Sequence, residues 1–356
     1  MHHKTAAGPI LIGIAGTELD ATARAQLCHP AVGGVVLFSR NYASREQLLD
    51  LVGQVRTCCQ PRPLVCIDQE GGRVQRLREE FTALPPLGEL GRMYATNPER
   101  ALDFAYRHAR VMAAEMLACG IDLSFAPVLD LDRGSSVIGD RSFSPSLEAV
   151  TRLGRTYLAG MRDAGMKSTG KHFPGHGSVL ADSHSDDVID DRSLAELEQA
   201  DLVPFTQLAG QLDALMIAHV VYPQVDLLPA GYSSKWLQGY LRGSLGYEGV
   251  IMSDDLGMHA AHVAGNLLDR CNLSLQAGCD LVLACQPADV EELLGGLDRP
   301  MPDASRAIAS LYGTARHSFA ELEMAASQGA PEWRQWQQSL ELLSKAQQKA
   351  SNKPGV

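Results

Sequence analysis

The sequence lacks an excess of basic residues and lacks long apolar runs. Its 31 Lys and Arg residues against 42 Asp and Glu residues give a formal net charge of −11. This balance argues against a generic nucleic-acid binder, because a protein needs a basic surface to neutralise phosphates. No apolar run approaches the ~20 residues that a membrane-spanning helix requires. We therefore expect neither nucleic-acid nor membrane partners.

The eight cysteines form no CxxC pair. Several of them lie inside apolar segments, as expected for buried, reduced thiols of a cytosolic protein. A charged N-terminus followed by the apolar run Pro9–Ala15 has two features of a signal peptide. That run is brief, contains Gly13 and suits a first β-strand better. The sequence therefore predicts a cytoplasmic protein.

A dinucleotide-binding GxGxxG does not follow the first apolar run, and no linker marks a second domain. The chain has 356 residues, 45% of them hydrophobic, which is enough for a sizeable core. We predict one catalytic domain over residues 1–330, followed by a C-terminal helix and frayed tail over 331–356. An apolar stripe with helical spacing predicts packing for that helix: Trp333, Trp336, Leu340 and Leu343.

Short runs rich in Val, Ile and Leu recur along the chain and suit strands that are covered on both faces. There are eight: Ile10–Ala15, Gly34–Phe38, Leu64–Ile67, Asp122–Leu129, Met166–Thr169, Ala214–Val221, Gly249–Met252 and Asp280–Ala284.

Helical patterns lie between most of these runs. Capping boxes start at Ser44 and Ser193. Junctions of the type helix–Gly–strand recur at Gly120, Gly165 and Gly278, where glycine adopts the left-handed conformation easily. Eight strands alternating with helices predict an α/β fold, a single-domain (β/α)8 TIM barrel with a C-terminal helical extension. The alternative is an open doubly wound sheet.

In such a barrel, function collects at the C-terminal ends of the strands. Charged residues follow strand after strand in this sequence, among them Asp68 and Arg76 after the third run and Arg141 after the fourth. The fifth run leads into a loop that concentrates ionisable side chains: Lys171, His172, His176, Asp182 and His184. We take this loop as the centre of the active site.

Two pairs of residues suggest acid–base or nucleophilic chemistry. Asp254 and Asp255 end the seventh run, where a carboxylate can be a nucleophile, a general base or a metal ligand, and where one of the two is expected to cap the next helix. Asp182 and His184 are two apart on an extended loop, so both can point to one side. A carboxylate beside a histidine fixes its tautomer and raises its basicity. The alternative for Asp182 and His184 is a helix-entry turn.

A metal site is a competing interpretation, because His172 and His176 could bind an ion together with Asp68 or Asp254. Metal sites need a closed ligand set, and Lys171 among these residues would compete with the ion electrostatically. We therefore expect no metal and no other cofactor.

Four blocks of the sequence resemble glycoside hydrolase family 3. They are KHFPGHG at 171–177 followed by DSH at 182–184, DQEGGRVQR at 68–76, SFAPVLD at 124–130 and GYEGVIMSDDL at 246–256. The blocks stand in family order, and the resemblance runs from about Ile10 to Cys285. Larger family members carry an acid/base glutamate on a second domain. This chain is too short for that domain, which points to the single-barrel, histidine-using branch of bacterial β-N-acetylglucosaminidases of cell-wall recycling.

The resemblance implies roles by position. Asp254 matches the catalytic nucleophile, His184 the acid/base and Asp182 the aspartate paired with it. Five residues match those that hold the N-acetylglucosamine unit: Asp68, Arg76, Arg141, Lys171 and His172. Glycines around Pro174 suggest the hypothesis that the histidine loop moves, so that His184 enters the site when substrate binds.

The implied activity is that of a retaining exo-β-N-acetylglucosaminidase. Its small-molecule substrates would be N-acetylglucosaminyl-1,6-anhydro-N-acetylmuramic acid and its peptide-bearing forms, and the enzyme is expected to be a monomer. Three alternatives stay open. A phosphorylase on the same scaffold would benefit because neutral histidine repels phosphate less than a carboxylate does. The others are a non-catalytic muropeptide-binding sensor and a metal-dependent hydrolase.

Overall fold

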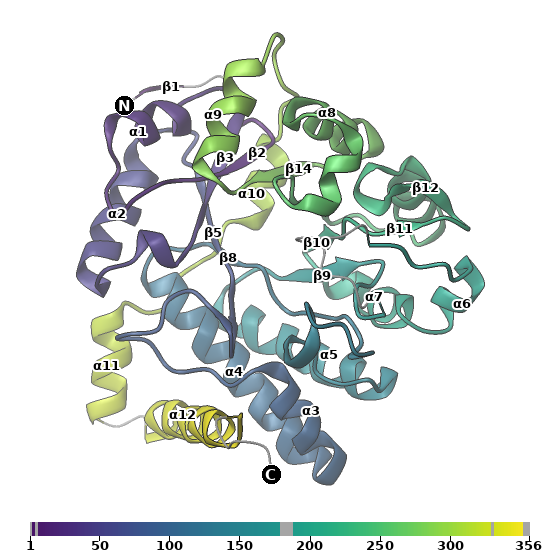
Figure 1. Ribbon diagram of the computed structural model, residues 1–356. Coiled ribbons are helices and arrows are strands. Elements are labelled where there is room, and N and C mark those ends of the chain that lie inside the picture. The colour runs from purple at the N-terminus through teal and green to yellow at the C-terminus, as the bar shows by residue number, and fades with distance from the viewer. Residues whose placement is uncertain (1, 4–5, 179–187, 329–330, 352–356) are drawn as a thin grey trace.

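The computed structural model describes residues 2–3, 6–178, 188–328 and 331–351, and its centre is a parallel barrel ringed by helices (Figure 1). The barrel strands are β2 (Ile10–Gly13), β3 (Val32–Leu37), β5 (Leu64–Ile67), β8 (Leu123–Ser124), β9 (Thr169–Phe173), β10 (Ala214–Ile217), β13 (Val250–Asp255) and β14 (Leu281–Ala284). They hydrogen-bond in the order β8-β5-β3-β2-β14-β13-β10-β9. Each strand thus pairs with its neighbours in the chain. The predicted (β/α)8 barrel is confirmed, and the doubly wound alternative, whose strand order would reverse in the middle, is wrong.

The two ends of this order, β8 and β9, meet through the segment that follows β8. The Thr169 N–H donates to the Ala126 oxygen at 2.8 Å, and the Leu129 N–H donates to the Lys171 oxygen at 2.7 Å. Regular pairing is short here because Pro127, which lies between these contacts, has no N–H to give to the ladder. These bonds bring the chain after β8 alongside β9 and nearly close the barrel.

Side chains on the strands alternate between the barrel interior and the helices outside. Leu11 belongs to the interior cluster, whereas its neighbours Ile10 and Ile12 pack with the helices. Ile308 of α10 (Ser305–Leu311) joins the interior cluster and lies against Gly33 at the start of β3. The interior is therefore a packed core that α10 helps to cover where the strands begin. Further interior residues are Val36, Cys66, Phe125, Met216, Met252 and Leu283.

The predicted helix signals are confirmed except for the Ser44 capping box. Glu196 accepts the Ser193 N–H and completes the Ser193 box, whereas Gln47 accepts the N–H of Ala43 and not that of Ser44. The Ser44 and Ser193 hydroxyls each accept the backbone N–H three residues on, as capping residues do. The junction glycines Gly120, Gly165 and Gly278 have φ of 78°, 97° and 121°. The helices that surround the barrel are α1 (Ala21–Leu27), α2 (Arg45–Thr57), α3 (Leu87–Thr96), α4 (Pro98–Ala118), α5 (Leu147–Ala164), α6 (Leu194–Glu198), α7 (Leu202–Leu208), the π-helix η5 (Lys235–Ser244), α8 (Leu267–Ala277) and α9 (Pro287–Gly296).

Smaller elements decorate the loops. Short strands pair outside the barrel: β1 (His2–His3) with β4 (Cys59–Gln60), β6 (Gln69–Gly71) with β7 (Val74–Gln75), and β11 (Val221–Tyr222) with β12 (Asp226–Pro229). The 3-10 turns are η1 (Ser39–Asn41), η2 (Gly139–Arg141), η3 (Ala209–Gln211), η4 (Ala230–Tyr232) and η6 (His259–Ala264).

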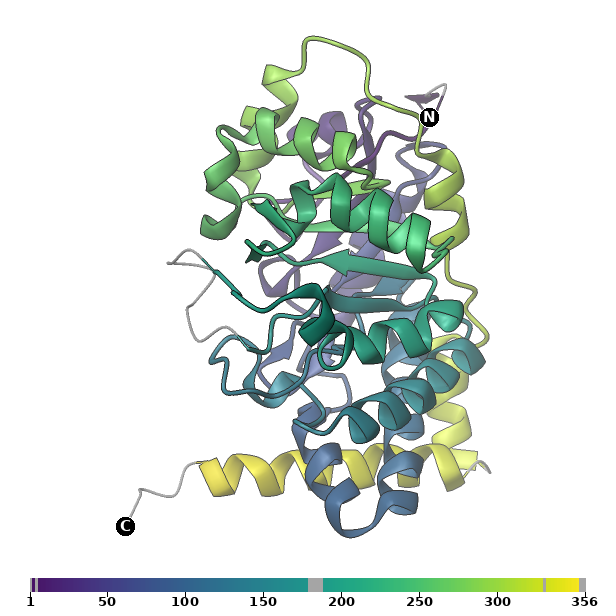
Figure 2. The same ribbon diagram turned by 90° about the vertical axis from the view of Figure 1, so that its right-hand side faces the viewer.

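The chain ends in two helices, α11 (Phe319–Gln328) and α12 (Pro331–Ser351), and Figure 2 shows α12 as a long rod beside α3 and α4. The predicted apolar stripe packs inward. Leu340 is fully buried, and Trp336 meets the edge of Tyr106 in α4 with ring centroids 6.2 Å apart. No helix in the described part of the chain is long and apolar enough to cross a membrane.

Candidate active site

A cavity of about 540 Å³ lies at the carboxyl ends of the barrel strands. Six of the eight predicted site residues line it: Asp68, Arg76, Arg141, Lys171, His172 and Asp254. The other two, Asp182 and His184, lie outside the described residues. Asp68 and Asp254 are almost 190 residues apart in the sequence and line the same cavity, because the carboxyl ends of all barrel strands lie on one side.

The fifth strand lies later in the chain than predicted, because β9 begins where the predicted Met166–Thr169 run ends. Thr169 pairs with Ala214, and Phe173 pairs with Ile217. Lys171 and His172 are thus strand residues and not loop residues. The apolar pattern stops before the strand does, because Lys171 and His172 are polar. They are nevertheless buried in the strand, where charged side chains pair with them.

The first such partner set is a buried ion-pair network around Lys171, which is 1% exposed. Its Nζ lies 2.7 Å from Asp68 Oδ1 and 2.6 Å from Glu70 Oε1. Arg141 donates two hydrogen bonds to the same Glu70, from Nε to Oε2 at 2.9 Å and from Nη2 to Oε1 at 2.8 Å. Arg76 Nη2 lies 3.2 Å from Asp68 Oδ2. Two carboxylates therefore hold three cations in a fixed arrangement at the cavity wall.

These ion pairs decide the protonation states. Burial alone would raise the pKa of Glu70, but Arg141 and Lys171 outweigh it and hold that pKa well below its usual range. Burial likewise lowers the pKa of Lys171, and the attraction of Asp68 and Glu70 reverses this and raises it. Glu70 and Lys171 are therefore both charged at neutral pH, and Lys171 acts as a hydrogen-bond donor.

A third carboxylate, Asp130, orients the His172 ring and holds the backbone of His176 in the KHFPGHG block. It is fully buried, and its Oδ2 accepts the His172 Nδ1–H at 2.6 Å and the His172 backbone N–H at 3.1 Å. Its Oδ1 accepts the His176 backbone N–H at 2.7 Å. Burial raises the pKa of Asp130, and the interactions with His172 outweigh it and lower that pKa. With Nδ1 held by Asp130, Nε2 of His172 lies 3.4 Å from Arg141 Nη2.

Asp254 and Asp255 at the end of β13 differ in their surroundings. Asp255 Oδ1 accepts the N–H groups of Gly257 and Cys285, both at 3.1 Å, which ties the turn after β13 to the end of β14. Burial is the main cause that raises the pKa of Asp255 to about 6. Asp254 Oδ1 accepts the Asp255 N–H at 2.8 Å, and within the described residues its Oδ2 accepts no hydrogen bond. Asp254 therefore has one carboxylate oxygen that no described group bonds, at the wall of the cavity.

The expectation that one of these aspartates caps the following helix is wrong. The next element, η6, has Met258 before its first residue and no side-chain cap. Asp255 instead accepts N–H groups of the turn and of the neighbouring strand, because the sheet brings Cys285 within reach.

The predicted site list missed Glu70 and Asp130, the two carboxylates that hold the predicted residues in place. Both lie in the segments that follow barrel strands, and both fall inside blocks that resemble the family, at 68–76 and 124–130. The sequence could not show their partners, since Glu70 bonds Arg141 across 71 positions and Asp130 bonds His172 across 42.

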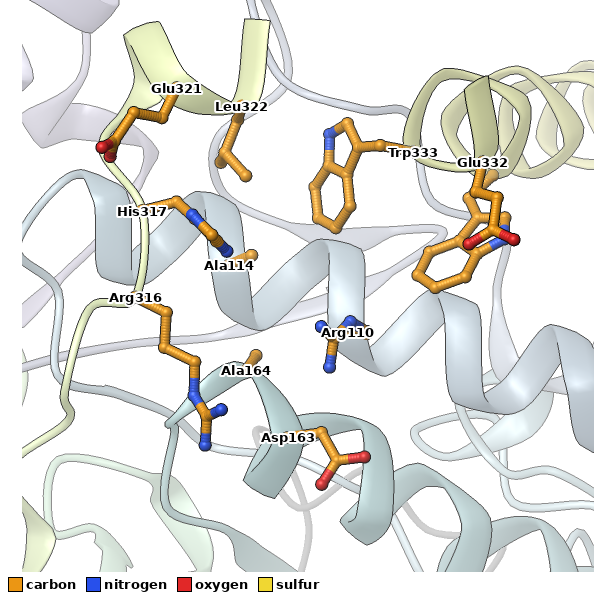
Figure 3. A pocket seen from close by; sticks show the side chains of 11 residues that line it. Arg110, Ala114, Asp163, Ala164, Arg316, His317, Glu321, Leu322, Glu332 and Trp333 are labelled. Carbon is orange, nitrogen blue, oxygen red and sulfur yellow. The ribbon is translucent and has the colours of Figure 1, made fainter. Parts of the chain in front are cut away.

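A second, smaller cavity of about 240 Å³ lies outside the barrel, among α4, α5 and the C-terminal segment (Figure 3). Arg110, Asp163 and Trp333 are among the residues that surround it. It contains none of the predicted site residues. A possible metal-ligand cluster also lies elsewhere: in the described ranges, three ligand atoms come within 4.8 Å of one another at Cys28, Cys58 and Cys59.

A (β/α)8 barrel with preorganised charges and an available carboxylate around one cavity at the strand ends is an enzyme architecture. Comparison with known families specifies it: the Glycosyl hydrolase family 3 N terminal domain matches residues 10–309. The chain belongs to this family and is a glycoside hydrolase, as the four sequence blocks predicted.

Relatives support this assignment over most of the chain. A "Beta-hexosaminidase" of Stenotrophomonas maltophilia is 54% identical over 287 residues, covering 80% of this chain and 85% of the relative. Another from Alkalilimnicola ehrlichii is 51% identical over 309 residues, covering 86% and 89%. The crystal structure of NagZ from Neisseria gonorrhoeae in complex with N-trifluoroacetyl-D-glucosamine has a TM-score of 0.88 at 42% identity, covering 97% of this chain and 100% of that one.

Proposed function

We propose that this glycoside hydrolase is a retaining exo-β-N-acetylglucosaminidase of the cytoplasm that acts in cell-wall recycling. It removes N-acetylglucosamine from N-acetylglucosaminyl-1,6-anhydro-N-acetylmuramic acid and its peptide-bearing forms. The observation that carries the proposal is Asp254, whose Oδ2 is available in the same cavity as the charged network. The names of the relatives support the N-acetylhexosamine unit. The eight reduced cysteines support a reducing compartment.

In the proposed mechanism, Asp254 attacks the anomeric carbon while His184 protonates the departing glycosidic oxygen. A covalent glycosyl-enzyme forms. Neutral His184 then takes a proton from water, which attacks the anomeric carbon and releases the sugar with its configuration retained. A histidine with a pKa near neutrality can serve both steps, and Asp182 would fix its tautomer. The assignments of His184 and Asp182 rest on the family resemblance.

The charged network would position the sugar. Asp68 offers carboxylate oxygens, and Lys171 and Arg141 offer donors to sugar hydroxyl and N-acetyl groups. Because these side chains are already held by one another, little rotamer freedom is lost when substrate binds. Such preorganisation lowers the entropic part of the barrier. His172, held by Asp130, would present its Nε2 as an acceptor.

The test uses a chromogenic aryl β-N-acetylglucosaminide beside the matching β-glucoside. The proposal predicts turnover of the N-acetyl substrate alone, abolished in Asp254→Asn and unchanged in the exposed control Asp50→Asn. With a poor natural leaving group, His184→Ala should lower kcat by about 10²- to 10⁴-fold, the usual contribution of a general acid. Full activity in Asp254→Asn would refute the nucleophile assignment.

The same assay separates the alternatives. A sugar 1-phosphate formed only after phosphate is added would identify a phosphorylase. Binding of muropeptide without turnover, in phosphate or without it, would identify a sensor. Loss of activity on chelation would favour the metal-dependent hydrolase.

A further inference from the structure

We propose that Cys28, Cys58 and Cys59 form a three-thiolate site for a thiophilic divalent cation such as Zn²⁺, at the end of the barrel opposite the catalytic cavity. The inference is independent of the proposed function. It rests on where the fold places the three sulfur atoms, because the spacing of these cysteines in the sequence matches no metal-binding motif.

The three side chains converge from separate elements. Cys28 follows the last residue of α1, Cys58 follows the last residue of α2, and Cys59 begins β4. Main-chain bonds fix two of these positions: the Cys28 N–H donates to the Arg24 oxygen at 3.0 Å, and the Cys58 N–H donates to the Val55 oxygen at 3.3 Å. The site is thus built on helix ends that the fold already holds.

The sulfur separations suit thiolate coordination. A zinc–thiolate bond is about 2.3 Å long, so two thiolates on a tetrahedral ion lie about 3.8 Å apart. The Cys58 and Cys59 sulfurs are 3.8 Å apart, and all three sulfurs lie within 4.8 Å of one another. The longest distance between two of the three sulfurs is at most 4.8 Å, about 1.0 Å more than the distance expected between two thiolates on one ion. Rotation of a side chain can close this difference.

Burial and access also fit a metal site. Cys58 and Cys59 are 4% and 0% exposed, whereas Cys28 is half-buried and gives an ion a way in. Neighbouring Cys59 and burial raise the pKa of the Cys58 thiol well above its usual range, so this thiol is protonated when no ion is bound. Binding of the ion would form three metal–sulfur bonds and release three protons to solvent, leaving a complex of net charge −1. Thiolate ligands select a thiophilic cation such as Zn²⁺, whereas Mg²⁺ and Ca²⁺ prefer oxygen ligands.

Such an ion would act on stability and not on catalysis. Cys59 lies just before β5, at the amino end of the strands, whereas the catalytic cavity lies at their carboxyl ends. The backbone of β1 pairs with β4 in the register His2 with Cys59. A bound ion would therefore clamp the ends of α1 and α2 beside the pairing that anchors the N-terminal strand.

The experiment titrates Cd²⁺ into reduced, metal-stripped full-length protein and follows the sulfur-to-cadmium charge-transfer absorption, with Zn²⁺ as competitor and Mg²⁺ as hard-ion control. We expect one equivalent to bind, Zn²⁺ to displace it, and the melting temperature to rise. Cys28→Ser should weaken binding by more than about tenfold, since even residues behind a metal ligand contribute that much.

Two matched variants keep the test specific. Cys119→Ser removes another thiol that follows a helix end, that of α4, and Cys285→Ser removes the thiol that lines the catalytic cavity. Both should bind Cd²⁺ as the wild type does. Cys28→Ala repeats the test if Cys28→Ser folds poorly. Wild-type affinity in both Cys28 variants, an absent charge-transfer band, or a disulfide within the cluster of the purified protein would overturn the proposal.

Discussion

Replacement of Glu70 by glutamine should both destabilise the protein and impair its site. Glu70 is 2% exposed and accepts three hydrogen bonds, one from Lys171 and two from Arg141. Glutamine keeps the shape but removes the charge, and it turns an NH₂ group toward one of the donors. Breaking a buried ion pair in this way costs about 3–5 kcal/mol. We expect the lower end, about 3 kcal/mol, because Lys171 still has Asp68 at 2.7 Å.

Urea denaturation at neutral pH measures this cost, and steady-state kinetics measures its effect on the site. KM should rise and kcat should fall, because Arg141 loses the carboxylate that orients it. Glu148→Gln is the control, since Glu148 pairs with Arg152 at the surface and its side chain is 70% exposed. A Glu70→Gln protein whose free energy of unfolding lies within about 0.5 kcal/mol of wild type would refute the reasoning, because that is the range of surface substitutions.

The pKa of Glu70 is lowered in the folded state, so Glu70 stabilises the fold above its unfolded-state pKa, and this stabilisation is lost as the pH falls. Asp130→Asn should lower the free energy of unfolding by about 2 kcal/mol and reduce kcat, because the amide cannot accept all three N–H groups of His172 and His176; unchanged urea curves and rates would contradict this. Gly177→Ala should reduce kcat about 100-fold with the fold retained on circular dichroism, because a Cβ would lie 1.7 Å from the Leu131 oxygen and shift the chain leading to the predicted His184. Burial raises the pKa of Glu115 from 4.5 to about 7, so the folded state binds this proton more tightly than the unfolded state does. The free energy of unfolding should therefore fall by about 3 kcal/mol as the pH rises from 4.5 to 7. Urea titrations should show a flatter pH dependence for Glu115→Gln, and an equal slope in the variant would exclude Glu115 as its source.

The barrel could be predicted because its strands are buried on both faces. Each becomes a short apolar run, and glycines with positive φ at 120, 165 and 278 mark where helices end. The rule overestimated the fourth strand, where Asp122–Leu129 was predicted and β8 covers only Leu123–Ser124, and it misplaced the fifth strand, where charge replaces apolarity. Lys171 and His172 are buried in β9, and their ionic partners come from other strands. The Lys171–His172 peptide bond is also cis, for which a sequence without proline at that position gives no signal.

The sequence could predict that polar residues gather around one cavity, as six of the eight do, but it could not predict their contacts. The topology brings strand ends together, so polar residues after strands were correctly expected to gather. Which carboxylate holds which cation depends on packing across many positions, as Glu70 and Arg141 show. Position at the strand end did not distinguish Asp254 from Asp255, and only the family resemblance singled out Asp254. The structure adds a physical difference, because the N–H groups of Gly257 and Cys285 bond Asp255. The roles of Asp182 and His184 remain predictions.

The most direct test of the account is peptide mass spectrometry of enzyme quenched with acid during turnover of an activated aryl β-N-acetylglucosaminide. The account predicts an N-acetylglucosaminyl adduct on the peptide that contains Asp254, absent from Asp254→Asn, and a first-formed product with the β configuration. An adduct on another residue, or a first-formed product with the α configuration and no adduct, would contradict a covalent intermediate on Asp254.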